Sequence, residues 1–336
     1  MVKIYWSDGL VISDGHEKMT FDPRRTIEGC VTFITHAHGD HVSGFLNPGE
    51  KCSTKQTADL YRAGNRRKPE DHKCLQYGET LKLDTCRVQL LNAGHILGSA
   101  QFKIETPEGV IVYTGDMNLQ ETLLTAPAEI EDAEVLIIES TYGEPSYVFP
   151  RREYTYADIA KWISQTLETG RTPFFRVSPV GKAQEIIAIT NQLTYADVVV
   201  HPKVSCFSEV YVRNGAKLRY HDAKSEEGEE ILARGEAVLV YPQNEEAAPQ
   251  GEVSQAVATG WALRFKRWDV DKAFPLSLHA DFRQLLSYVE AARPRIVYTC
   301  HGFDDRLATI IRKRCRIEAY PIKNLSRESL TDYLFS

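Results

Sequence analysis

The sequence predicts a mixed α/β (α+β) protein in which a second domain is inserted into the first. Three observations predict this arrangement. Residues 2–150 carry short β-branched and aromatic runs broken by turn residues, residues from about 155 to 270 alternate strand-like runs with helical patterns, and the last part repeats strand, helix, strand, helix. We therefore expect a first domain made of residues 1–152 and 271–336, interrupted by an inserted domain at 153–270.

The first part is expected to be rich in strands, because its apolar runs are too short for helices and end at turn residues. The predicted strands are KIYW at 3–6, GCVTFITHA at 29–37, RVQLLNAG at 87–94, AQFKIET at 100–106, GVIVYTGD at 109–116 and AEVLIIES at 133–140. One helix is expected at 54–64, and a longer one at 157–170 that ends at Gly170.

The inserted part has the rhythm of a small sheet domain built from βαβ units. Its predicted strands lie at 174–179, 197–202, 217–220 and 237–242, and its predicted helices at 182–193 and 226–234. The closing part is expected to form strands at 273–278 and 295–301 and helices at 280–292 and 305–315.

The bulk composition is that of an ordinary soluble protein. No apolar run approaches the ~20 residues of a membrane helix, and the N-terminal MVKIYWSDGL lacks a signal-peptide pattern, so we expect a cytoplasmic protein without a membrane partner. The seven cysteines include no C-x-x-C pair, which excludes an evident cysteine zinc site. The net charge of −6 argues weakly against a polyanionic partner, although metal cations and local basic clusters could supply the field.

The densest chemical signal is the run Thr-His-Ala-His-Gly-Asp-His directly after the apolar VTFI. It places His36, His38, Asp40 and His41 on one loop at a strand end, where alternate side chains can point at one metal ion. Neutral imidazole and carboxylate are the ligands of open zinc sites. Two later strands end in the same way, at His95 after LLNAG and at Asp116 after VIVYTG.

The order H-x-H-x-D-H, G-H-x-x-G-S and T-G-D resembles the metallo-β-lactamase superfamily, whose fold is a four-layer αββα sandwich. The resemblance implies one metal held by His36, His38, His95 and Asp116. It implies a second metal held by Asp40, His41 and Asp116. Two such ions can activate a hydroxide and stabilise both oxygens of an in-line phosphoryl displacement, which suits phosphodiesters. Zinc is expected from the histidine-rich ligation, and iron or manganese in one position is also chemically allowed.

The second half resembles the β-CASP branch, in which a cap domain is inserted. VLIIESTYG, FPLSLHADF and RIVYTCHG present Glu139, His279 and His301 in the order of the three β-CASP motifs. The resemblance implies that His301 completes the second metal site, that His279 donates a proton to the leaving oxygen, and that Glu139 orients His279. A histidine acid suits this role because its pKa of ~6.5 lets it reload near neutral pH.

Substrate contacts are predicted on weaker grounds. SPVGKAQEII starts a helix after a strand, and Lys182 with Ser178 at its N-terminus could hold a phosphate. Arg151 and Arg152 follow the first β-CASP motif and could line the mouth of the cleft, although each of these side chains could equally be a plain surface charge. Trp261 could stack a base, but packing is the expected role.

The resemblance leaves the nucleic acid open. The glutamate and histidine of the first and third β-CASP motifs resemble RNA-processing members, whereas GHILGSAQ, ESTYGEPSY and SLHADFRQLL look closest to short exonucleases associated with DNA ligases. We therefore expect DNA end processing, with a DNA ligase or helicase as a functional partner, and RNA processing as the alternative. A small-molecule hydrolase of the same fold and an inactive scaffold explain fewer of the motifs.

Overall fold

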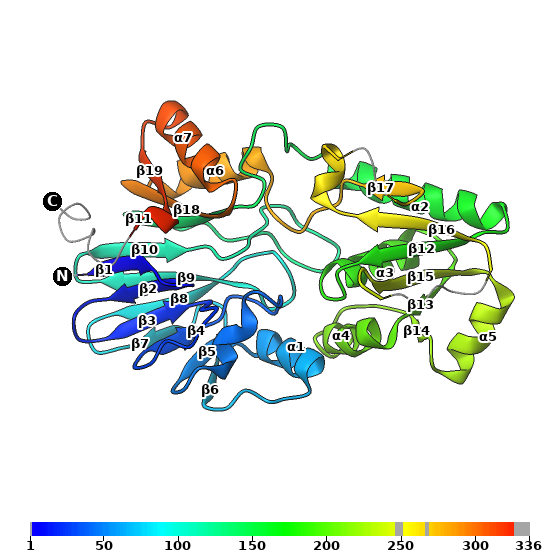
Figure 1. The fold of residues 1–336 in the computed structure, drawn as a ribbon, viewed down its shortest axis with the longest axis horizontal. Coiled ribbons are helices and arrows are strands. Elements are labelled where there is room, and N and C mark those ends of the chain that lie inside the picture. Colours follow the sequence, from blue (N-terminus) through cyan, green and yellow to red (C-terminus); the bar gives the residue numbers. More distant parts are fainter. Residues whose placement is uncertain (1, 246–250, 266–268, 326–336) are drawn as a thin grey trace. The chain divides into compact units, whose positions relative to one another are not determined.

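The computed structural model of the chain describes residues 2–245, 251–265 and 269–325, which fall into two compact units (Figure 1). The first unit consists of Met1–Glu121, Thr125–Ser146 and His279–Ser336, and the second of Thr122–Leu124 and Tyr147–Leu278. Both contain helices and strands, so the predicted mixed α/β class is confirmed. No helix among the described residues is long and apolar enough to cross a membrane.

The first unit contains two mixed sheets. In spatial order, the first sheet consists of β1 (Lys3–Trp6), β2 (Leu10–Ser13), β3 (Lys18–Phe21), β4 (Val31–Phe33), β5 (Lys51–Thr54) and β6 (His72–Leu75). The second consists of β19 (Glu318–Pro321), β18 (Ile296–Gly302), β11 (Val135–Ser140), β10 (Gly109–Tyr113), β9 (Ala100–Thr106), β8 (Arg87–Asn92) and β7 (Thr80–Lys82). Strand β11 is buried along its whole length between two parallel neighbours, which agrees with the apolar run 135–138 that begins it.

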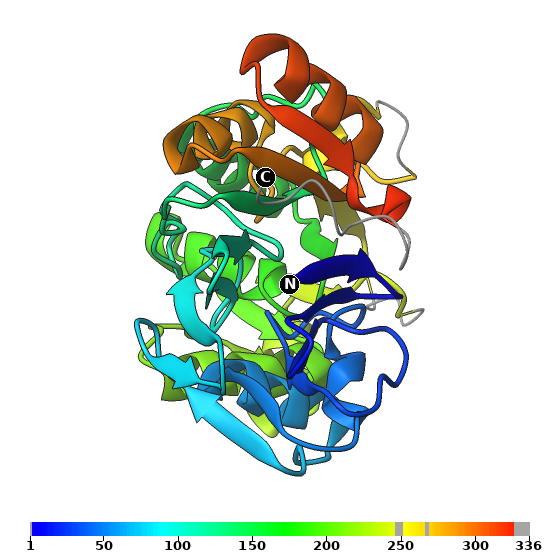
Figure 2. The same ribbon diagram turned by 90° about the vertical axis from the view of Figure 1, so that its left-hand side faces the viewer.

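One hydrophobic core joins the two sheets of the first unit face to face. Phe21 and Phe33 of the first sheet stack with ring centroids 5.0 Å apart, and both contact Phe102 of the second sheet at 5.3 and 5.2 Å. Helix α1 (Lys55–Asn65) packs on the first sheet, and Figure 2 shows α6 (Phe282–Ala292) and α7 (Asp304–Arg314) on the second, near β18 and β19. The arrangement is two sheets flanked by helices on their outer faces.

The strand directions bring several chain reversals to one edge of the second sheet. Strands β10, β11 and β18 are mutually parallel, so their carboxyl ends lie at the same edge. Strand β8 has the same direction, because β9 is antiparallel to both β8 and β10. The segments that follow β8 and β10, and the ends of β11 and β18, therefore meet at this edge.

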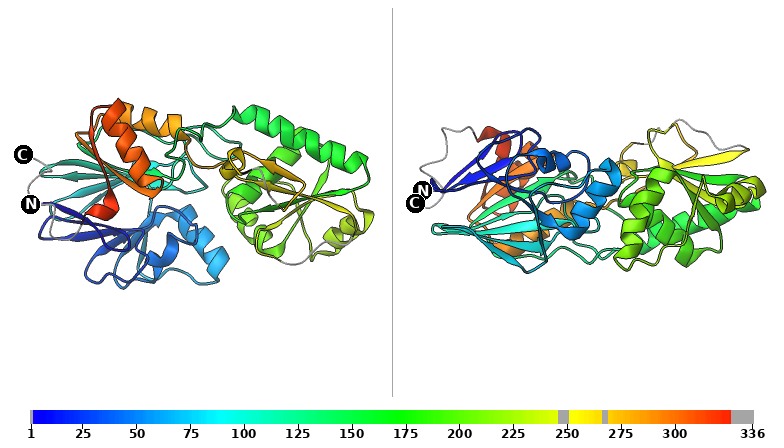
Figure 3. Two further views of the ribbon diagram at one scale, coloured as in Figure 1. Left: turned by 45° about the horizontal axis from the view of Figure 1, so that its top comes forward. Right: turned by 90° about the horizontal axis from the view of Figure 1, so that it is seen from below.

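The second unit is a six-stranded parallel sheet with helices on both faces (Figure 3). Its spatial order is β14 (His221–Asp222), β13 (Asp197–Val200), β15 (Ala237–Pro242), β12 (Thr172–Val177), β16 (Val253–Ala258) and β17 (Lys272–Phe274). Its helices are α2 (Arg152–Glu168), α3 (Lys182–Leu193), α4 (Pro202–Arg213) and α5 (Glu226–Arg234). A short 3₁₀ turn, η2 (Gly260–Leu263), also lies in this unit, whereas η1 (Val42–Leu46) and η3 (Ile322–Asn324) lie in the first unit.

Two details of the second unit differ from the sequence prediction. The strand expected at 217–220 is wrong, since the backbone N–H and C=O of Arg219 bond to the side chain of Asn191 instead of a neighbouring strand. Helix α4 was not expected, because its valines and aromatic residues have high strand propensity. Pro202 at its first turn and the N-cap side chain of His201 start the helix.

Candidate metal centre

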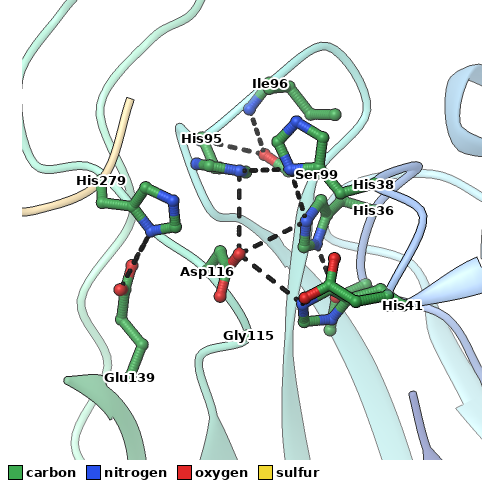
Figure 4. Close-up of polar contacts among 12 residues, drawn as sticks. His36, His38, His41, His95, Ile96, Ser99, Gly115, Asp116, Glu139 and His279 are labelled. Carbon is green, nitrogen blue, oxygen red and sulfur yellow. Dashed lines mark hydrogen bonds and ion pairs between the residues drawn. The ribbon is translucent and has the colours of Figure 1, made fainter. Parts of the chain in front are cut away.

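Three histidines and one aspartate of the first unit converge at the edge of the second sheet where β8, β10, β11 and β18 end (Figure 4). His36 and His38 come from the loop after β4, His95 follows β8, and Asp116 follows β10. The Nδ1 atom of His38 lies 3.0 Å from Nε2 of both His36 and His95. Asp116 Oδ2 lies 3.5 Å from His36 Nε2 and 3.8 Å from His95 Nε2. Three nitrogens and one oxygen at these separations suit a single tetrahedral ion.

Gly94 allows the approach of His95 to this group. Its φ is +69°, and a Cβ there would lie 2.4 Å from the carbonyl oxygen of Asn118 and 2.7 Å from the amide nitrogen of Ala128. Only glycine fits both the conformation and the space. Asp116 is preceded by Gly115, whose φ is +52° and whose missing side chain leaves room for Thr35.

A second group shares Asp116 and consists of His41, Asp116 and His301. The Nε2 atom of His41 lies 3.6 Å from Asp116 Oδ2 and 3.6 Å from Asp40 Oδ2. The Nε2 atom of His301 is buried and has no hydrogen-bond partner among the described residues, which is costly unless a cation binds there. The side chain of Asp40 is 61% exposed, so this second group is the more open of the two.

The buried charges of this cluster fit a cation. Burial lowers the pKa of His36 well below its ordinary value, so this imidazole is neutral and can act as a ligand. Burial also lowers the pKa of His41, but Asp116 and Asp22 outweigh it and raise the pKa to about 10. Without a metal, His41 therefore carries the positive charge that balances the carboxylates, and a bound cation would take over this role.

Asp22 organises the hydrogen bonds behind these ligands. Its carboxylate accepts from the amide of Thr35 at 2.8 Å, from Thr35 Oγ1 at 2.6 Å and from His41 Nδ1 at 2.8 Å. Because the Thr35 hydroxyl gives its one proton to Asp22, His36 Nδ1 must donate to that hydroxyl, at 2.9 Å. Both His36 and His41 are thereby held with Nε2 free to ligate.

The sequence prediction did not include Asp22 or Thr35. The signal for Asp22 was present, because it directly follows strand β3 in the same way that Asp116 follows β10. Its φ of +46°, uncommon for a residue other than glycine, marks the sharp turn that brings the carboxylate behind the histidine loop.

Glu139 and His279 form a pair beside the metal ligands, and one ligand atom of each lies within 4.8 Å of Asp116 (Figure 4). The Nδ1 atom of His279 lies 3.1 and 3.2 Å from the two carboxylate oxygens of Glu139, which is fully buried. The amide of Met117 donates to Glu139 at 2.7 Å. Burial raises the pKa of Glu139, but His279 and these hydrogen bonds outweigh it and lower the pKa, so the carboxylate stays ionised.

His279 lies over the first metal group. Its ring centroid is 4.4 Å from that of His95, and its side chain is 21% exposed. Because Glu139 contacts Nδ1, it fixes the orientation of the His279 ring. The seven predicted metal ligands and the predicted His279 and Glu139 pair all lie in the first unit.

The four predicted substrate contacts lie in the second unit and differ in environment. Lys182 is the first residue of α3, where burial lowers its pKa to about 8, and Ser178 follows β12 and donates to the carbonyl of Val180. Arg151 is 74% exposed, whereas Arg152 is only 9% exposed and paired with buried groups. Trp261 is half-buried against Tyr147, at 5.3 Å between ring centroids.

Several proteins are similar to this chain in sequence. A protein named probable DNA ligase from Opitutus terrae is 35% identical over 299 residues, which cover 87% of this chain and 28% of that protein. RNase aCSPSF2 of Saccharolobus solfataricus is 35% identical over 49% of this chain and 31% of its own length. The RNase J-like protein of Methanocaldococcus jannaschii is 35% identical over 47% of this chain and 42% of its own length.

The chain thus matches less than half the length of each of these relatives. No family model matches the sequence. Among solved structures, a protein of unknown function from Enterococcus faecalis V583 has a similar fold, with a TM-score of 0.63 over 91% of this chain and 95% of that one, at 15% sequence identity.

Proposed function

The chain belongs to the β-CASP branch of the metallo-β-lactamase superfamily, and we propose that it is a metal-dependent nuclease. One observation carries this proposal: two groups of metal-binding side chains share Asp116, and a histidine–glutamate pair lies beside them, within 4.8 Å of the same aspartate. We assign the first unit as the four-layer αββα sandwich of the superfamily and the second as its inserted cap. The face-to-face sheets with flanking helices support the first assignment.

Two divalent cations are the proposed cofactors. His36, His38, His95 and Asp116 would hold one, and Asp40, His41, Asp116 and His301 the other. Zinc is the proposed metal because the donors are mainly imidazole nitrogens, with manganese or iron possible in one position. Bound there, the pair would supply Lewis acidity toward a phosphodiester and lower the pKa of a water molecule.

The protein's own groups perform the proton transfers and the orientation. Asp40, the exposed carboxylate of the cluster, orients the attacking water. His279 donates a proton from Nε2 to the leaving oxygen, while Glu139 accepts from Nδ1 and so fixes the ring and stabilises its charged form. Lys182, Ser178 and Arg151 are proposed contacts to substrate phosphates. Arg152 was also predicted as such a contact, but its burial supports a different role, argued below.

Single-stranded or end-exposed DNA is the proposed substrate, cut as an exonuclease. The Opitutus terrae relative, which matches 87% of this chain, supports DNA, because it is named a probable DNA ligase. RNA is the second candidate, supported by the relatives whose names are those of RNases. A DNA ligase or helicase is the proposed functional partner in the first case.

End-labelled oligonucleotides test this proposal. Matched single-stranded DNA and RNA, labelled at the 5′ or the 3′ end, are incubated with zinc or manganese and with wild-type or Asp40→Ala protein. We expect cleavage that the variant loses, and the ladder then gives the polymer and the direction. If neither polymer is cut with any metal, the nuclease function is refuted.

A further inference from the structure

The second unit contains a buried ionic network centred on Arg152. The guanidinium of Arg152, at the start of α2, donates from Nη1 to Glu185 Oε1 at 2.7 Å. Glu185 is 1% exposed, and the hydroxyl of Tyr156 donates to the same oxygen. Burial and Glu185 raise the pKa of Tyr156, so this hydroxyl keeps its proton.

The second branch of the same guanidinium reaches the backbone. Nη2 of Arg152 donates to the carbonyl oxygen of Ser277 at 2.5 Å, and Ser277 is itself buried. Ser277 belongs to the second unit and His279 to the first, and two peptide bonds join them. Arg152 therefore holds the segment that leads directly into the proposed general acid.

On the other side of His279, the backbone is held from within the first unit. The amide of Ala280 donates to the carbonyl of Met117 at 2.7 Å, and the amide of Met117 donates to Glu139, the partner of His279. The backbone of His279 thus lies between two hydrogen bonds, one at Ala280 and one at Ser277. The first is made within the first unit, by the carbonyl of Met117, and the second is made by the guanidinium of Arg152.

We propose that Arg152 is a positioning residue for His279, acting through the carbonyl of Ser277. The proposal rests on the nuclease function proposed above. A buried ion pair is weak evidence of stability, because apolar residues of similar volume serve a core as well or better. Unlike an apolar side chain, the planar guanidinium provides two donors at a fixed angle. One donates to Glu185 and the other to the backbone carbonyl of Ser277, just before His279.

The leaving group of the substrate provides the test, because only a poor leaving group needs the acid. The double variant Arg152→Met with Glu185→Leu removes both charges of this ion pair together. A general acid contributes ~10²- to 10⁴-fold, so a displaced one should lower kcat on a single-stranded oligonucleotide at least about tenfold. On bis(p-nitrophenyl) phosphate, whose leaving group departs without a proton, kcat should change less than about twofold. His279→Ala should show the same selective loss.

A matched control removes an arginine that also holds a backbone carbonyl in the second unit. Arg171 Nη2 donates to the carbonyl of Val253 at 2.6 Å, at the start of β16. Arg171→Met should leave both activities unchanged. If the double variant does not fold, Arg152→Lys replaces it, since lysine keeps the charge but cannot span both acceptors. It should show the same selective loss.

Three results would overturn the proposal. The double variant could cleave both esters like the wild type, or it could lose both to the same extent while still binding metal. Arg171→Met could also cause the same selective loss. If the wild type cleaves neither ester, the nuclease function fails first, and this outcome is distinguishable because no variant is needed to see it.

Discussion

Replacing Asp22 with asparagine should weaken metal binding without removing a single ligand. The Oδ1 atom of Asp22 accepts from the amide of Thr35, and its Oδ2 atom accepts from Thr35 Oγ1 and His41 Nδ1, so both carboxylate oxygens must act as acceptors. In Asp22→Asn, one branch becomes an NH₂ donor. If this NH₂ group faces Thr35 Oγ1 and His41, it donates to both. The Thr35 hydroxyl must then donate its proton to His36 Nδ1, and His41 Nδ1 must become an acceptor. Both rings then carry their proton on Nε2, the atom that should ligate.

The expected loss follows from such outer hydrogen bonds. Removing one typically costs 10- to 100-fold in metal affinity, which is about 1.4 to 2.7 kcal/mol, and Asp22 supports one ligand of each proposed ion. We therefore expect both dissociation constants to rise by at least about tenfold. The assay is competition for zinc between the metal-free protein and a chromophoric chelator, with the number of bound ions measured by mass spectrometry.

Asp14→Asn is the matched control. Asp14 is also a buried carboxylate of the first unit that accepts backbone amides, from His16 and Glu17, each at 2.8 Å. Its hydrogen-bond partners are His16, Glu17 and Cys86, none of which is a proposed ligand, so its replacement should leave zinc affinity unchanged. The reasoning is refuted if Asp22→Asn binds both ions as tightly as the wild type, or if Asp14→Asn weakens them equally.

Three further predictions concern stability. Gly94→Ala should destabilise the protein by at least about 2 kcal/mol in urea unfolding, because the backbone is left-handed and a Cβ would clash with the carbonyl oxygen of Asn118. The control Gly78→Ala has a similar φ but open space around the Cβ, so it should cost only about 1 kcal/mol. Burial and Lys51 lower the pKa of His72 from 6.5 to about 4. The unfolded chain therefore binds a proton at His72 more readily than the folded protein does, so the free energy of unfolding falls by up to about 3 kcal/mol as the pH drops from 6.5 to 4. His72→Gln should abolish this contribution, which is measured as Tm against pH. Zinc at about 100 times its Kd should raise the free energy of unfolding of the first unit by about 2.7 kcal/mol. In calorimetry, Asp116→Asn should lose most of this zinc-dependent stabilisation. An equal stabilisation of the variant would contradict the place of Asp116 in both metal groups.

The proposed ligands of the first unit could be predicted from the sequence because each has a local signal. Each lies at the end of a short apolar strand or in the segment that follows one, and strands of the same direction bring the ends of β8, β10 and β18 together at one edge of the second sheet. Asp22 obeys the same rule but stands alone after β3, without histidines beside it to mark its chemistry. Its role depends on distances across the fold that a sequence does not contain.

The second unit shows where the sequence was insufficient. Arg151 and Arg152 are neighbours of identical type, yet one is exposed and the other buried, because α2 starts at Arg152 and not at 157 as predicted. With the observed start, Arg152 falls on the buried stripe with Thr155, Tyr156 and Ile159, at helical spacing. An error in the helix boundary therefore concealed the difference between a surface charge and a buried one.

The most direct test of the proposed function is a metal titration of the metal-free protein. Zinc or manganese is added in known equivalents, and hydrolysis of a labelled single-stranded oligonucleotide is measured at each step. We expect no cleavage without metal and a rise that levels off when both proposed sites are filled. Cleavage that persists in the metal-free protein, or no cleavage at any loading, would contradict a two-metal nuclease.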